Sequence, residues 1–315
     1  MSSTPDIQPP SVAGQHQPDP GGRRRRPKPV GVRLALFGMA LVAVSLIGAV
    51  AGTAIGPDVV IVAEAPPPIG EGVVTAAEGY RLVLLRDVLD PAAPQVQFAI
   101  EDQDGRRVQR FTPVHERLLH LIVVSRDLTS FHHVHPKLDR KGQWTIDLPT
   151  LAAGSYRAIA DFQVEDGARL ALGSDLVVPG DQRIGHLPEP TNVSKVDGYD
   201  VELHTIERRG GEVEATLTVR RDGRPVTDLQ PYLGANGHLI ALRTGDLAYS
   251  HVHPTDDGPG KRPVAPTDGS VHFDATLTSA GRYALFFDFR HGGVVHTASF
   301  TFDQGAVVGA AEMEH

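Results

Sequence analysis

The chain has 315 residues, of which 41% are hydrophobic and 22% are charged, and its net charge is −8 at pH 7. This length is enough for two domains of ordinary size. The absence of cysteine excludes disulfides, thiolate metal ligands and a lipid-modified cysteine. Because residues 1–33 hold six Lys/Arg and two Asp/Glu, the rest carries 24 basic and 36 acidic residues. That acidic balance argues against nucleic acid as a partner and is mildly favourable for cations.

The N-terminal part predicts export. Residues 1–33 are basic and rich in Pro, Ser and Gln, so we expect a disordered cytoplasmic tail. Residues 34–56 follow, with 22 uncharged residues from Leu34 to Ile55, enough for a transmembrane helix. Since positive charge stays cytoplasmic, we expect a single-pass cell-membrane protein with its C-terminal body outside. The alternative is a signal segment cleaved near Ala49–Ala51, which gives a secreted protein.

The exported part is internally repeated. After a Pro/Gly-rich spacer at 57–75, we expect one repeat at 76–180, a linker at 181–195, a second repeat at 196–304 and a disordered tail at 305–315. The repeats consist of short alternating segments, cut by turn residues about every 8 to 12 positions. The pattern therefore predicts an all-β fold with two tandem immunoglobulin-like antiparallel β-sandwich repeats.

Each repeat contains one histidine pattern. His120 precedes His133 and His135 by thirteen and fifteen residues, and the pair lies in a His-Val-His-Pro sequence. The second copy has the same spacing at His238, His251 and His253.

The segments between these histidines are typical of β-hairpins. A turn at Arg126-Asp127 would place His120 directly opposite His133, with His135 on the same face. A turn at Thr244-Gly245 would place His238 opposite His251 in the same way. We therefore expect three imidazoles to share one face in each repeat.

Three imidazoles on one face suit Cu(II) or Zn(II). The candidate metal ligands are His120, His133, His135, His238, His251 and His253. Histidines that only one copy has receive less weight; these are His115, His132, His272, His291 and His296. Asp161 and Asp288 occupy equivalent strand positions and are interpreted as structural residues, or as partners of a motif histidine.

The segments Phe131–Pro136 and Tyr249–Pro254, each with its upstream His-Leu-Ile, resemble a family of bacterial exported proteins with β-sandwich repeats. Members are described as heavy-metal-binding or uncharacterised. More distantly, the architecture is similar to copper-binding sandwiches of the CopC type. The resemblance implies metal binding outside the cytoplasm. This chain has no mature N-terminal His ligand and only three Met, which argues against a Cu(I) role.

Catalysis is not expected. His115-Glu116 and His120 resemble a zinc-protease motif, but three residues separate Glu116 from His120 where the motif has two. A metal-dependent hydrolase would need a carboxylate base, for which only Asp161 or Asp288 is a candidate. The sequence thus predicts a membrane-anchored protein that binds or delivers a transition metal, with one site per repeat. The alternative is a non-catalytic module that binds another envelope protein and whose histidines are structural.

Overall fold

A computed structural model describes residues 71–255, 265–277 and 279–305, except for the side chains of Arg209, His251 and His253. These residues belong to the compact unit Pro67–His315. The expected tail at 1–33, the apolar segment at 34–56, most of the spacer at 57–75 and all but the first residue of the 305–315 tail lie outside the described residues. Within them, no helix has the length and apolar character needed to cross a membrane.

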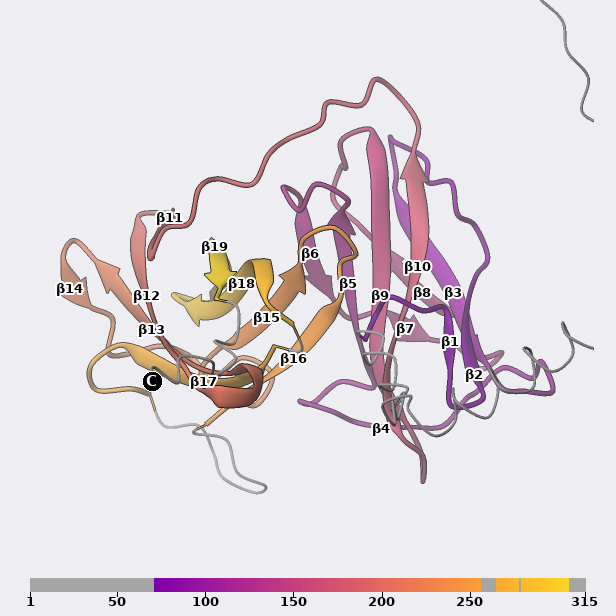
Figure 1. The fold of residues 1–315 in the computed structure, drawn as a ribbon. Coiled ribbons are helices and arrows are strands. Elements are labelled where there is room, and N and C mark those ends of the chain that lie inside the picture. The colour runs from indigo at the N-terminus through magenta and orange to yellow at the C-terminus, as the bar shows by residue number, and fades with distance from the viewer. Residues whose placement is uncertain (1–70, 256–264, 278, 306–315) are drawn as a thin grey trace, which may run out of the picture. The chain divides into compact units, whose positions relative to one another are not determined.

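The first repeat consists of two antiparallel sheets, whose strands have a common core (Figure 1). One sheet has the order β1 (Ala76–Ala77), β2 (Tyr80–Leu84), β3 (Gln95–Glu101), β8 (Trp144–Asp147), β7 (Lys137–Leu138). The other has the order β10 (Arg169–Val178), β9 (Gly154–Val164), β5 (Leu119–Ser125), β6 (Phe131–Val134), with β4 (Phe111–Thr112) also paired to β9. Alternate residues of β3, such as Phe98, and of β9, such as Phe162, fill the space between the sheets.

In the second repeat the strands form one continuous antiparallel sheet. Its order is β11 (Val193–Val196), β12 (Tyr199–Glu207), β13 (Glu212–Arg221), β17 (Ser270–Thr276), β16 (Tyr249–Pro254), β15 (His238–Arg243), β18 (Gly281–His291), β19 (Val294–Gln304). A short strand β14 (Arg224–Pro225) pairs with β13, and a 3-10 turn η1 (Arg209–Gly211) precedes β13. One apolar cluster contains residues from near both ends of this order, including Val201 of β12 and Phe300 of β19, so the sheet folds over its own core.

The His-Val-His-Pro motifs lie where the chain passes between sheets or sheet halves. In the first repeat, β6 pairs with β5 in one sheet and β7 pairs with β8 in the other, and His135-Pro136 joins them. In the second repeat, β16 pairs with β15 up to His251 and with β17 from Val252 onward. A strand that changes partners in this way turns a corner of the structure. The motif therefore occupies an equivalent corner in each repeat.

The expected hairpin register is wrong by two residues, although the expected face is correct. His133 lies opposite Ile122, not His120, and His251 lies opposite Ile240, not His238. Because the side-chain period along a strand is two residues, a shift of two keeps the same residues on the same face. The shift arises because the loops are longer than two residues, and a leucine with positive φ in each, Leu128 or Leu247, is buried.

A third apolar cluster contains side chains from both repeats. The first repeat contributes Ile122, Val124, Leu128, Ile159 and Ala171, and the second contributes Ile240, Leu242, Leu247, Tyr249, Ala284 and Phe286. Strand β5 is therefore buried on both faces, which accounts for its uninterrupted apolar sequence. The all-β expectation, with antiparallel sheets in tandem repeats, is confirmed.

Candidate metal centre

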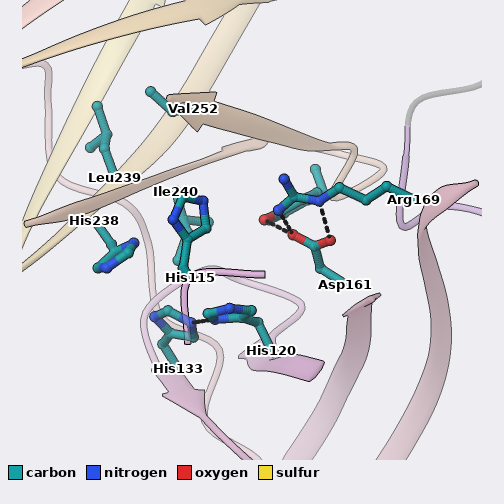
Figure 2. Close-up of a pocket in the computed structure, with 10 residues that line it drawn as sticks. His115, His120, His133, Asp161, Arg169, His238, Leu239, Ile240 and Val252 are labelled. Carbon is teal, nitrogen blue, oxygen red and sulfur yellow. Dashed lines mark hydrogen bonds and ion pairs between the residues drawn. The ribbon is translucent and has the colours of Figure 1, made fainter. Parts of the chain in front are cut away.

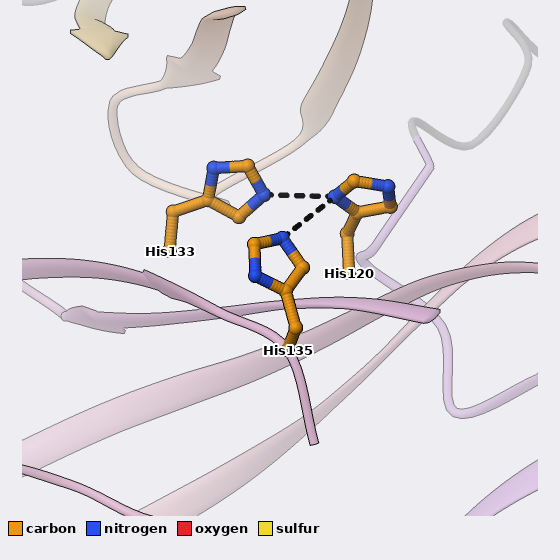
Figure 3. Close-up of side chains that lie close together, drawn as sticks. All are labelled: His120, His133 and His135. Carbon is orange, nitrogen blue, oxygen red and sulfur yellow. Dashed lines mark hydrogen bonds between the residues drawn. The ribbon is translucent and has the colours of Figure 1, made fainter. Parts of the chain in front are cut away.

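The three predicted first-repeat histidines converge at one point (Figure 3). His120 projects from β5, His133 from β6, and His135 follows β6 at the corner. The Nδ1 atom of His120 lies 3.0 Å from Nε2 of His133 and 3.2 Å from Nε2 of His135. One nitrogen from each ring lies within 4.8 Å of the other two. The three rings thus present nitrogen atoms to a single small volume.

Hydrogen bonding determines which nitrogen of His120 carries the proton. Its Nε2 lies 2.9 Å from the carbonyl oxygen of Val114. A carbonyl oxygen only accepts, so Nε2 donates and Nδ1 of the neutral ring holds a lone pair. The second repeat has the same bond at the same spacing, because His238 Nε2 lies 2.8 Å from the carbonyl oxygen of Tyr232.

His133 is oriented by a carboxylate from the second repeat. Its Nδ1 donates to Oδ2 of Asp288 over 2.8 Å, and both side chains are at most 4% exposed. The other carboxylate oxygen accepts from the hydroxyl of Thr297 over 2.5 Å. A carboxylate that accepts from one ring nitrogen leaves the opposite nitrogen, Nε2, as the lone-pair atom. In the neutral ring this atom faces Nδ1 of His120.

The Nδ1 atom of His120 and the Nε2 atom of His133 face each other over 3.0 Å, and with both rings neutral each of these atoms holds a lone pair. The third ring, His135, turns Nε2 to the same point and can hold its own lone pair there. Burial, with His133 close by, lowers the pKa of His120 to about 3. Burial, with His133 and His120 close by, lowers the pKa of His135 to about 2. His120 and His135 are therefore neutral imidazoles, whose lone pairs a shared cation would stabilise.

The separations suit a single transition-metal ion. Two nitrogens bound at about 2.0–2.1 Å to one tetrahedral ion lie roughly 3.3 Å apart. The observed 3.0 and 3.2 Å are close to this separation. Neutral imidazole nitrogen is a preferred ligand of Zn(II) and Cu(II). The arrangement could hold either ion with small side-chain adjustments.

Two further histidines lie beside the triplet (Figure 2). The ring of His115 lies 5.3 Å from that of His238 and 6.1 Å from that of His120, measured between centroids. The His238 ring is 6.3 and 6.5 Å from those of His133 and His120, compared with 5.0 to 5.2 Å within the triplet. A cavity of about 20 Å³ is lined by four of these rings, without that of His135, together with Asp161, Arg169 and Tyr249. That volume accommodates a water molecule or an ion and is too small for an organic substrate.

The counterpart of His115 in the second repeat is Leu233, so the repeated pattern does not predict a role for His115. His115 and Leu233 both have positive φ, in tight turns that precede His120 and His238. Comparison of the repeats therefore identifies the turn but gives no role for His115. Glu116 also has positive φ. The His115-Glu116 pair therefore lies in a turn rather than on a zinc-protease helix.

The predicted second-repeat ligands are described only in part. His238 is buried at the start of β15 and lies next to the first-repeat rings. His251 and His253 belong to β16, and their side chains lie outside the described part of the chain. The backbone register of β15 and β16 repeats that of β5 and β6. A second triplet therefore remains a prediction.

The two aspartates have different surroundings. Asp161 accepts two bonds from Arg169, of 3.0 and 2.8 Å, and one from the Tyr249 hydroxyl of the second repeat, of 2.9 Å. Asp288, as described above, accepts from a motif histidine. Both carboxylates are almost fully buried. Asp288 thus matches the interpretation as a partner of a motif histidine, whereas Asp161 pairs with an arginine.

The other unshared histidines bond to partners away from the triplet. The hydroxyl of Ser130 lies 3.3 Å from His132, and that of Thr216 lies 3.0 Å from His272. In the second repeat, His291 contacts Asp228 and Tyr199, and His296 contacts Asp197. None of these four lies in the triplet formed by described residues.

No curated protein matches the sequence. Solved structures with partial likeness include a DUF4426 family protein from Pseudomonas aeruginosa PAO1, at 10% identity and a TM-score of 0.27 over 36% of this chain and 96% of that one. Invasin, a bacterial integrin-binding protein, is 16% identical with a TM-score of 0.22 over 72% of this chain and 39% of that one. The Yersinia pseudotuberculosis adhesin InvE is 13% identical with a TM-score of 0.22 over 71% and 58%.

This chain therefore spans well under two thirds of both adhesin structures. Likeness at this level carries no argument about function. One family model matches residues 75–173 and 194–305, which is more than half of the chain and includes both histidine motifs. The chain belongs to the family described as Domain of unknown function (DUF8832).

Proposed function

We propose that this protein binds or delivers a transition metal, Cu(II) or Zn(II), through His120, His133 and His135. The observation that carries this proposal is the convergence of three ring nitrogens while the opposite nitrogens of His120 and His133 donate to Val114 and Asp288. Hydrogen bonds of this kind fix the tautomer and the ring orientation of metal-binding histidines. Three ring nitrogens that converge on one point match the way in which imidazoles bind a single ion.

The proposal includes a second ion bound by His238, His251 and His253. The repeated spacing, the repeated backbone register and the equivalent bond from His238 to Tyr232 support it. Borderline imidazole ligands favour divalent ions, and the three methionines of the chain give little support for Cu(I). One ion per repeat is the expected stoichiometry.

A binding or delivery role is favoured over catalysis. The two buried carboxylates near the histidines already accept bonds, Asp288 from His133 and Thr297, and Asp161 from Arg169 and Tyr249. Carboxylates engaged in these bonds are less available as bases for water activation. The cavity of about 20 Å³ has room for an ion.

The sequence supports a location outside the cytoplasm for this activity. The uncharged segment from Leu34 to Ile55, preceded by a basic tail, predicts a membrane anchor or a signal segment. The resemblance to exported tandem sandwich proteins described as heavy-metal-binding agrees with this location. We therefore propose an extracytoplasmic metal-binding protein of the cell envelope with immunoglobulin-like repeats.

Metal uptake by the purified full chain tests the proposal. After dialysis against Zn(II) or Cu(II), elemental analysis should find up to two ions per chain, and one ion after His133→Ala with His135→Ala. His204→Ala is the matched control, because His204 is exposed on β12, and it should leave uptake unchanged. A wild-type chain that retains neither metal would refute the function.

Melting temperature separates this function from the alternative of an envelope interaction module with structural histidines. Under the metal proposal, added zinc at 100 times the Kd stabilises the wild-type chain by about 2.7 kcal/mol for each occupied site. The variant with His133→Ala and His135→Ala should lose the zinc-dependent stabilisation that the first site contributes. A loss of stability that is the same with metal and with chelator would support the structural alternative.

A further inference from the structure

We propose that the second repeat completes the first-repeat metal site through Asp288, so that metal binding and docking of the two repeats stabilise each other. This inference rests on the proposed function and assigns a positioning residue to it. Asp288 lies 155 positions after His133 in the sequence. Its contact with His133 is therefore made only when the repeats are packed together.

The burial of Asp288 depends on its partners. A buried carboxylate is costly unless hydrogen bonds satisfy its oxygens. Thr297, its neighbour across β18 and β19, satisfies one oxygen from within the second repeat. The other oxygen is satisfied by His133 from the first repeat. Separation of the repeats would remove the ring partner of Asp288 and the orienting partner of His133 together.

The surrounding contacts also join the repeats. Phe131, two residues before His133 on β6, stacks on Phe286, two residues before Asp288 on β18, with ring centroids 3.9 Å apart and planes at 6°. The hydroxyl of Tyr249 in the second repeat donates to Asp161 in the first. The strand that carries His133 is thus held against the strand that carries Asp288 by apolar as well as polar contacts.

Thermodynamic linkage gives the consequence. If metal binds more tightly when Asp288 orients His133, then metal must favour the docked arrangement by the same free energy. Loss of a group that orients a metal-bound histidine typically lowers metal affinity by about 10- to 100-fold. A site contained within one repeat would show no such dependence on the other repeat.

The first test is Asp288→Asn, measured in the full chain with His251→Ala and His253→Ala so that only the first site is observed. We expect zinc affinity, measured by competition with a chelator, to fall about 10- to 100-fold. The Cu(II) electron paramagnetic resonance spectrum should change as well, because the electronic character of the His133 ligand changes. Asp288→Glu should recover part of the affinity.

The matched control is Asp197→Asn. Asp197 accepts from His296 over 2.7 Å in the same repeat, and neither residue belongs to the triplet. In Asp197→Asn, zinc affinity should stay within about threefold of that of the parent chain, which carries only His251→Ala and His253→Ala. A parent chain that binds no metal would overturn the proposed function itself. A parent that binds metal with unchanged affinity after Asp288→Asn would overturn only the dependence on Asp288.

Docking is measured separately. The chain has no cysteine, so Lys141→Cys and Arg224→Cys, at exposed positions of the two repeats, provide two unique sites for spin labels. Zinc is diamagnetic and should narrow the distribution of distances between the labels. The narrowing should be reduced by Asp288→Asn and retained in Asp197→Asn. A distribution that zinc leaves unchanged in a metal-binding chain would refute the linkage.

Discussion

Acidification of the metal-free protein should destabilise it, because His120 is buried as a neutral ring. In the folded chain the pKa of His120 is lowered from 6.5 to about 3, chiefly by burial. Between these two values the unfolded chain binds a proton that the folded chain does not. The stability contributed by the neutral ring is therefore fully present above pH 6.5, and it is lost progressively as the pH falls toward 3.

The magnitude follows from the size of this window. Each pH unit below 6.5 costs about 1.36 kcal/mol for one such group, so a change from pH 7 to pH 5 removes about 2 kcal/mol through His120. His135 acts in the same direction, since its pKa is lowered to about 2, but its half-buried ring makes its contribution smaller. Burial also lowers the pKa of His238. The combined loss of unfolding free energy from the three histidines between pH 7 and pH 5 should therefore be at least about 2 kcal/mol.

Urea unfolding in the presence of a chelator provides the assay. Trp144 is the only tryptophan and is 1% exposed in the first-repeat core, so its fluorescence reports the unfolding of that repeat. His120→Gln cannot titrate, and its loss of stability between pH 7 and 5 should be smaller by about 2 kcal/mol. His204→Gln, at an exposed position, should behave like the wild type. The reasoning is refuted if wild type and His120→Gln show the same pH dependence.

Three substitutions test the packing that supports the site, each by urea unfolding at pH 7. Tyr249→Phe removes a buried bond to Asp161 and should cost about 1–3 kcal/mol; a change below about 0.5 kcal/mol would show that this bond is not needed. Leu121→Ala empties a fully buried position of β5 and should cost about 2–5 kcal/mol, and a neutral result would contradict its place in the core. Gly173→Ala should destabilise by about 1–3 kcal/mol or more, because a Cβ there would overlap the carbonyl oxygen of Gly72 and the Arg157 guanidinium; a folded chain of wild-type stability would disprove this close approach.

Much of the local structure could be predicted from the sequence. Alternating apolar residues and turn residues indicate strands, and the duplicated spacing of His120, His133 and His135 places three rings on one face. That placement is insensitive to the two-residue error in register, because side chains alternate with a period of two. The error itself came from Leu128, an apolar residue that the loop buries and that no turn pattern identifies.

The sequence by itself determined the strands, the repeats and the shared face of His120, His133 and His135, because these follow from backbone geometry over a few neighbouring residues. Only the tertiary structure decided that Asp288 accepts from His133 and that His115 and His238 lie beside the triplet. Those contacts join residues far apart in the chain. They depend on the complementary apolar surfaces of two repeats, a property that no local pattern records.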